Sequence, residues 1–327
     1  MRIHPSMLLL ALLLLGTAAL AETDARSPDE IHSSLVGSQA SCKDCHRTYY
    51  EEWKKSQHAE AWNSPLYQTA IKTRKRKESC YACHVPDSVI EQAPKKPKAR
   101  ADDFHSGITC ESCHRVGDKI GGPFGAKTQA HESVKHDFFG GKDSGLCLAC
   151  HDTNVGPVRA LGKSFAATKK AKQGKTCQHC HMPKRERTIA NDPETGKPTG
   201  EKRKARSHLI LGPSDPEFLA KAFGLGVSGP KDGVAILQLQ NRAGHRIPSL
   251  KLRNFQVKFA VLAEDGKELW SKERLLEGGR RNFLEAESSL DQEVPLPEGW
   301  MTMQVTVHHI LDGKDLGQVF QGQKKRE

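Results

Sequence analysis

Every cysteine of this 327-residue chain belongs to one repeated pattern, C-x-x-C-H. The copies are C-K-D-C-H at 42–46, C-Y-A-C-H at 80–84, C-E-S-C-H at 110–114, C-L-A-C-H at 147–151 and C-Q-H-C-H at 177–181. Two thiols at this spacing form thioethers to both vinyl groups of one porphyrin, and the histidine that follows lies under the iron as an axial ligand. Disulfides, a zinc site or a thioredoxin-like pair would not need a histidine after every second cysteine. We therefore predict five covalently attached haem c groups.

The predicted attachment and proximal-ligand residues follow directly from these motifs. The thioether cysteines are Cys42, Cys45, Cys80, Cys83, Cys110, Cys113, Cys147, Cys150, Cys177 and Cys180. The proximal iron ligands are His46, His84, His114, His151 and His181. No catalytic residue is predicted from the side chains themselves.

The function depends on the second axial ligands, because an iron with two protein ligands passes electrons and an iron with one open face can bind a small molecule. Beyond the N-terminal leader only Met182, Met301 and Met303 occur, and Met182 adjoins a proximal histidine. Histidines must therefore supply these ligands. The candidates are His32, His58, His105, His131, His136, His179, His208, His245, His308 and His309.

Six of these histidines are predicted as second axial ligands: His58, His105, His131, His136, His208 and His245. His58 would lie on a helix from about residue 48 to 62. At least one of His131 and His136 would be a ligand; if both are, they could fill the fifth position in place of His245. We expect His179 to be exposed and His309 to pack in a strand.

The motif regions resemble the periplasmic multihaem cytochromes of the cytochrome c-554 type, whose tetrahaem members accept electrons from hydroxylamine oxidation. The resemblance is carried by C-K-D-C-H-R-T-Y-Y-E-E-W-K-K-S-Q-H-A, by H-S-G-I-T-C-E-S-C-H-R, and by T-C-Q-H-C-H-M-P with S-H-L-I-L-G. It implies that His58 and His105 are distal ligands. This chain has five motifs where the type member has four haems, and it lacks the lysine that is typical of the catalytic haem of ammonia-forming nitrite reductases.

The N-terminus reads as a secretory signal over residues 1–21, with Arg2 before the apolar run M-L-L-L-A-L-L-L-L and A-L-A at 19–21. Cleavage would export the mature chain to the periplasm or an equivalent compartment and leave no integral membrane anchor. An uncleaved anchor is disfavoured because the apolar run is shorter than the roughly 20 residues that a spanning helix needs. Covalent haem attachment outside the cytoplasm agrees with this prediction.

The predicted fold is α+β, with two domains after the signal. Residues 22–225 would form a mainly helical, loop-rich pentahaem domain, in which haems replace much of the apolar core because only 36% of the chain is hydrophobic. Residues 226–327 alternate apolar and polar positions from about Val234, which predicts a small antiparallel β-sandwich after a linker around Gly224 to Lys231. The loop G-H-R-I-P, which carries His245, would reach the haem region from the sheet edge.

The formal net charge of +11 comes largely from three basic runs, at 72–77, 94–100 and 202–206. The propionates of five haems, about ten in all, would roughly cancel this excess. The alternative is that the basic runs dock an acidic redox partner. An exported chain excludes a nucleic-acid partner. We predict a carrier that passes electrons between redox proteins, either acidic ones or membrane-bound quinone-linked ones, through low-potential bis-histidine haems. The alternative is an oxidoreductase that acts on a small nitrogen or sulfur compound, such as nitrite or hydroxylamine, at one open haem.

Overall fold

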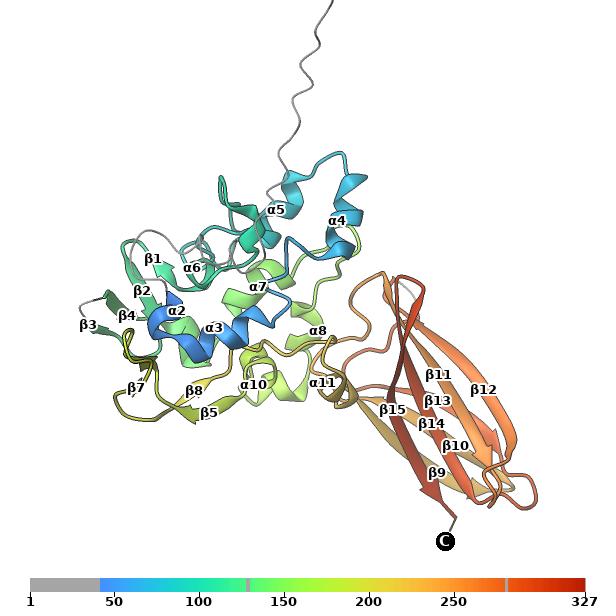
Figure 1. Cartoon of the computed structure of the whole chain (residues 1–327). Coiled ribbons are helices and arrows are strands. Elements are labelled where there is room, and N and C mark those ends of the chain that lie inside the picture. The colour runs from blue at the N-terminus through green and yellow to red at the C-terminus, as the bar shows by residue number, and fades with distance from the viewer. Residues whose placement is uncertain (1–41, 128–129, 280–281, 327) are drawn as a thin grey trace, which may run out of the picture.

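The computed structural model describes residues 42–127, 130–279 and 282–326. The predicted signal peptide and His32 lie outside the described residues. Short helices and small sheets form the haem-motif region, and long antiparallel strands form the C-terminal region beside it (Figure 1). Among the described residues, no helix has the length and apolar content to cross a bilayer.

Each motif forms one short helix, which places its two cysteines one turn apart. These helices are α2 (Cys42–Cys45), α5 (Glu78–His84), α6 (Cys110–His114), α7 (Gly145–His151) and α10 (Cys177–His181). Thr109 starts α6 by accepting a hydrogen bond from the Ser112 amide at 3.2 Å. The sequence T-C-x-x-C-H therefore contains its own helix start.

The helix predicted for residues 48–62 is shorter in the structure. Helix α3 (Arg47–Lys54) ends before His58, and α4 (Pro65–Lys72) begins after a series of turns. The Ser56 hydroxyl accepts hydrogen bonds from the amides of His58 and Ala59, at 3.2 and 3.4 Å. A serine side chain that takes backbone donors in this way competes with helical bonding, so His58 lies in a turn.

The remaining elements of this region are also short. They are η1 (Phe104–Ser106), η2 (Asp137–Gly140), α8 (Gly162–Ala166), α9 (Lys169–Lys172), α11 (Pro216–Ala220), β1 (Arg115–Val116), β2 (Lys119–Gly122), β3 (Ala126–Lys127), β4 (Glu132–Lys135), β5 (Lys184–Arg187), β6 (Ala190–Asn191), β7 (Pro198–Thr199) and β8 (Arg203–Arg206). They give one sheet of order β1-β2-β4-β3 and the pairs β5-β8 and β6-β7. The fold is mixed α and β, and a mainly helical haem region is not confirmed.

The C-terminal region contains two antiparallel sheets. One has the order β13-β10-β9, from β13 (Ser289–Pro295), β10 (Val234–Asn241) and β9 (Phe223–Lys231). The other has the order β12-β11-β14-β15, from β12 (Glu268–Glu277), β11 (Arg253–Leu262), β14 (Thr302–Leu311) and β15 (Lys314–Lys325). The linker predicted around residues 224–231 is instead strand β9, whose glycines conceal the alternating pattern. The predicted boundary at residue 226 therefore falls within β9.

A hydrophobic core fills the C-terminal region. Leu237, Leu239, Val257, Phe259 and Val305 are fully buried at alternate positions of their strands. Every member of this core cluster lies at or beyond Leu219 in the sequence. The hydrophobic core of the described residues is thus concentrated in the sheets, and the interior of the haem-motif region is built differently.

Candidate haem-binding site

A large cavity occupies the interior of the haem-motif region. Its volume is about 2990 Å³, and all ten cysteines and all five proximal histidines line it. That is about 600 Å³ for each motif, within the range of about 300 to 1000 Å³ that is usual for cofactor and ligand sites. The cavity, rather than a cluster of side chains, therefore forms the centre of this region, and five macrocycles fit its size.

The proximal histidines are oriented by backbone carbonyls. The Nδ1 atoms of His46, His84, His114 and His181 lie 2.8, 2.5, 2.7 and 2.5 Å from the carbonyl oxygens of Ile189, Ala61, Gly121 and Leu211, respectively. A carbonyl can only accept, so Nδ1 must carry the proton in each of these rings. Nε2 is then the free nitrogen, as an iron ligand requires.

Four proximal histidines each face a second histidine. With a metal–nitrogen bond of about 2 Å and about 1 Å from nitrogen to ring centre, two imidazoles on opposite sides of one iron have centroids about 6 Å apart. The observed centroid separations are 6.1 to 6.3 Å. The pairs are His46 with His131, His151 with His58, His114 with His208, and His181 with His245. Iron ligation by these pairs stays a prediction, and each pair has the spacing that it requires.

The second motif is different. The ring that packs on His84 is that of Tyr67, stacked at a centroid distance of 3.7 Å and an interplanar angle of 15°. This close, parallel stacking places Tyr67 against the face of the histidine rather than across an iron from it. Within the described part of the chain, no histidine faces His84 at the separation of the other four pairs.

Burial keeps three of the facing histidines, His58, His208 and His245, neutral, which is the form that binds a metal. It lowers the pKa of His58 to about 3, with the nearby His151 adding to the effect, and the pKa of His208 to about 4. The same cause lowers the pKa of four further histidines: His84, His114, His151 and His245.

His105 and His136, both predicted as ligands, are not brought to any proximal histidine in the described residues. The His105 ring is exposed, and its Nδ1 lies 3.0 Å from the Asn63 side-chain oxygen. The Nδ1 of His136 accepts a hydrogen bond from the Phe138 amide at 3.4 Å, which caps η2. Neither residue lines the cavity. Each therefore has a local structural contact in place of an approach to the iron sites.

The segment H-S-G-I at 105–108, which begins with His105, holds the backbone of His58 in place. The amide of Ile108 donates to the His58 carbonyl at 3.0 Å, and Trp53 Nε1 donates to the Ile108 carbonyl at 2.8 Å. Gly107 has φ +59°, and a Cβ atom there would lie 2.5 Å from the Ala59 carbonyl oxygen. Only glycine allows this close approach. The glycine of the motif thus positions the turn that carries His58.

A largely covered ion pair behind His208 was not predicted from the sequence. Arg187 donates to both carboxylate oxygens of Glu52, at 2.8 and 2.9 Å, and the His208 amide donates to Glu52 at 2.7 Å. The Tyr49 ring packs edge-on against His208 at 4.9 Å. Glu52, in α3, therefore holds the segment that carries His208 against the helix that follows the first motif. No sequence pattern marks this pair, because its members lie far apart in the chain.

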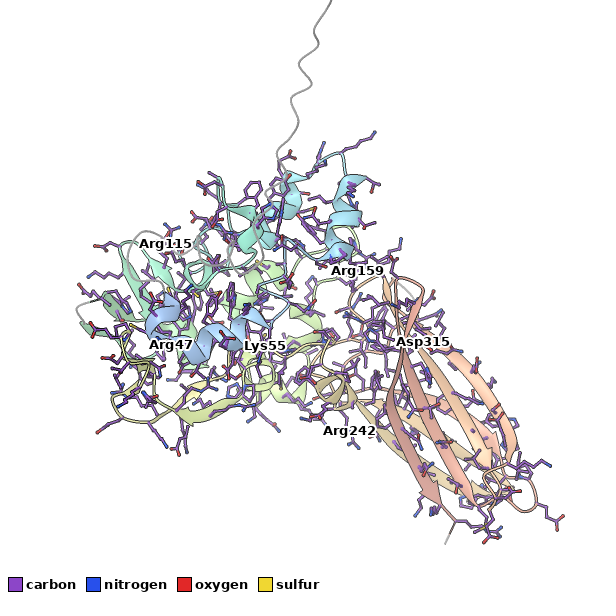
Figure 2. All side chains as sticks on the ribbon, in the orientation of Figure 1. Arg47, Lys55, Arg115, Arg159, Arg242 and Asp315 are labelled. Carbon is purple, nitrogen blue, oxygen red and sulfur yellow. The ribbon has the colours of Figure 1, made fainter. Side chains whose placement is uncertain are left out.

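Contacts between the two regions place His245. The amide of Arg246 donates to the Ser164 hydroxyl at 2.8 Å, and the amide of Arg159 donates to the Ser249 carbonyl at 3.1 Å. Gly244 lies so close to Phe165 that a Cβ would meet its ring at 3.2 Å. Figure 2 labels Arg159, on the side of the haem-motif region that faces the sheets. The G-H-R-I-P loop therefore reaches the fifth motif from the C-terminal region, and His309 is buried in its strand.

Thiol contacts show which motifs are neighbours in space. The Cys42 and Cys110 side chains lie close enough to interact. The same holds for Cys83 with Cys150 and for Cys147 with Cys177. The first motif therefore adjoins the third, and the fourth adjoins both the second and the fifth. Cys113 of the third motif lies near enough to both cysteines of the fourth motif to interact with them electrostatically, so these two motifs are also neighbours.

The cysteines make no cross-link to one another in this structure. All ten thiols are free of disulfides. Within residues 42–127, 130–279 and 282–326, no three His, Cys, Asp or Glu side chains converge as a metal-ion site. The donor set of two thiols and one histidine at each motif fits haem c.

Comparisons with known proteins agree with this geometry. The family model described as cytochrome c554 and c-prime matches residues 41–115. The solved penta-haem cytochrome c552 from Thermochromatium tepidum is similar over 87% of this chain and 97% of that chain, with a TM-score of 0.63 and 15% identity. This likeness shows a shared fold.

A glycosyl hydrolase family 2 member from Bacteroides cellulosilyticus matches 32% of this chain and 13% of that chain, with a TM-score of 0.22 and 13% identity, which supports no argument. No curated protein sequence matches the chain.

Proposed function

We propose that this chain is a multihaem c-type cytochrome that carries electrons between redox partners through five haem c groups. The match of residues 41–115 to the cytochrome c554 and c-prime family model supports this. One observation carries the proposal: the cysteines and histidines of all five motifs line one continuous cavity. Groups held side by side in one cavity would allow an electron to cross the whole region. The fold shared with a penta-haem cytochrome supports the number five.

The residues of this chain would hold each group in place. Two cysteines would anchor its edge, and the proximal histidine would present Nε2 to the iron, with Nδ1 bonded to a carbonyl at the first, second, third and fifth motifs. At the first, third, fourth and fifth motifs the facing histidine would supply the second ligand and keep water and small molecules off that iron. The haem supplies the electron chemistry through its ferric and ferrous states.

The expected potentials are low because methionine ligation, which raises them, finds no support in the structure. Met303 is buried in the core of the C-terminal sheets, and Met182 directly follows proximal His181. Histidine pairs therefore set the potentials of at least four sites.

We also propose that the protein acts in the periplasm or an equivalent exported compartment. The apolar N-terminal run and its A-L-A site support this. Its partners would be redox proteins, either soluble ones or membrane-bound quinone-linked ones.

Mass spectrometry of the mature protein tests the cofactor count, and a redox titration tests the carrier role. We expect five haem masses per chain and reversible reduction of all five at low potential. Fewer than five haems, or sites that cannot be reoxidised, would contradict the proposal.

The second motif favours an alternative function, reduction or oxidation of a small nitrogen or sulfur compound at one open iron. The supporting observation is that His84 lacks a facing histidine within the described residues, where Tyr67 packs against it instead. Electron paramagnetic resonance (EPR) of the oxidised protein decides between the two functions. One high-spin iron per chain together with turnover of nitrite or hydroxylamine would support the enzyme, whereas five low-spin irons would exclude it.

A further inference from the structure

A strongly basic exposed surface of the haem-motif region surrounds the second motif. Eight exposed side chains, which we call the second-motif patch, come from two segments: Lys72, Arg74, Lys75, Arg76, Lys77, Lys95, Lys96 and Lys98. Glu78 is the single acidic residue within 72–80 and 94–98. Among the described residues, no carboxylate forms an ion pair with any of the eight.

Local structure holds the two segments together beside the attachment site. Lys72 ends α4 and Glu78 begins α5, so the first segment is the loop that leads to Cys80. The Lys96 ammonium donates to the Ser79 carbonyl at 2.9 Å, which fixes the second segment against the start of α5. Arg74, Lys75 and Arg76 line the rim of the haem cavity. The patch therefore lies at the point where the second haem would approach the surface.

Haem propionates do not account for this charge. One haem brings two carboxylates, which together with Glu78 leave most of the eight cations uncompensated. Such an excess on one exposed surface creates a positive potential that attracts acidic macromolecules.

The second motif also lies at an end of the series of neighbouring motifs, because in the described part of the chain it adjoins the fourth motif alone. Its Cys83 contacts Cys150 of the fourth motif, which connects to the rest. Helices α4 and α5 lie at the upper edge of the haem-motif region in Figure 1. An electron delivered there would pass through the fourth motif to all other sites.

The other two ends of the network are less suited to docking by charge. At the fifth motif, the amide of Lys169 donates to the Glu287 carboxylate at 3.0 Å, and Lys170 donates to the Arg242 carbonyl. Those basic residues are therefore in contact with the C-terminal region. At the first motif, Arg47 lies among the acidic residues Asp44 and Asp192.

We propose that the second-motif patch is the docking surface for a redox protein with an acidic face, and that electrons enter or leave the cytochrome there. This inference rests on the proposed electron-transfer function and adds the place and the partner chemistry. Complementary charge accelerates encounter and orients the partner with its redox group toward the second haem.

The test is stopped-flow reduction of the oxidised haem-loaded protein by a reduced acidic plant-type [2Fe–2S] ferredoxin, whose potential of about −400 mV drives the transfer. The patch variant carries Lys72→Glu, Lys77→Glu and Lys95→Glu, three exposed residues of the second-motif patch that do not line the haem cavity. The control carries Lys267→Glu, Lys272→Glu and Lys314→Glu, three exposed residues of the C-terminal region. Both variants change the net charge equally.

At low ionic strength we expect the second-order rate constant to fall about tenfold or more in the patch variant and less than threefold in the control. The difference should vanish at about 1 M salt, where the screening length is about 3 Å. An equal loss in both variants, or no loss in the patch variant, would overturn the docking surface.

Two further measurements separate the docking surface from the carrier function. Dithionite, a small reductant, should reduce both variants and the native protein equally; if it reduces none of them fully, the carrier function fails rather than the patch. Carbodiimide cross-linking to the ferredoxin should join lysines of the second-motif patch. Cross-links confined to Lys169, Lys170 and Lys172 would place docking at the fifth motif and overturn the inference.

Discussion

Removal of the His245 ring should open the fifth haem and no other. His245 faces His181 at 6.3 Å with an interplanar angle of 11°, the most nearly parallel of the four pairs. The loop should keep its conformation, because it is held by its backbone and not by the His245 ring. The Asn241 side-chain amide donates to the backbone carbonyls of His245, Leu284 and Glu285 at 2.9 to 3.1 Å. His245→Ala therefore removes one ligand without removing the loop.

We expect His245→Ala to gain one high-spin iron per chain. If the second motif holds an open haem, the native protein has one high-spin iron and His245→Ala has two; if not, the counts are zero and one. The assay is spin quantitation by EPR of the oxidised protein. Millimolar imidazole should enter the vacated space and restore the native count.

His136→Ala is the matched control, because His136 was an equal candidate from sequence and the structure uses its ring to cap η2. We expect no change in its spin count. An unchanged spectrum in His245→Ala, or a new high-spin iron in His136→Ala, would refute the assignment of the fifth pair.

Three further predictions concern the residues that position the ligands. Glu52→Gln leaves the Arg187 guanidinium, only 11% exposed, without its charge partner and should lower the free energy of unfolding by about 3 kcal/mol, measured by denaturant titration. Burial raises the pKa of Glu52, but hydrogen bonds from Arg187 and a backbone amide lower it to a net value below its usual range. The native protein should therefore lose stability as pH falls through this lowered pKa, and Glu52→Gln should lose less; parallel melting curves against pH would contradict this. Gly107→Ala should cost more than the roughly 1–2 kcal/mol of a left-handed helical backbone. Its φ of +59° with ψ −131° lies outside that region, and its Cβ would lie 2.5 Å from the Ala59 carbonyl oxygen. Gly117→Ala, at φ +61° with no atom within 4 Å, adds a methyl group without a clash, and equal melting temperatures for the two variants would contradict the clash at Gly107.

The local chemistry of this protein could be predicted from its sequence alone. Haem attachment and proximal ligation need only five consecutive residues, so each C-x-x-C-H identifies its own site. The alternating apolar positions of Phe255, Val257 and Phe259 likewise predicted a strand, because side chains of a strand alternate between faces. These features depend on residue order over one turn or one strand, and the fold does not alter them.

The tertiary structure decided which distant residues meet. His105 and His131 were both candidates, and the fold brought His131 to His46 while it left His105 exposed. The contact of Cys42 with Cys110 makes the first motif a neighbour of the third rather than of the second. A second ligand comes from far along the chain, so its identity depends on how turns, the Glu52 ion pair and the C-terminal loop close the cavity. The spacing of residues in the sequence does not predict those contacts, because they form only when the whole chain is packed.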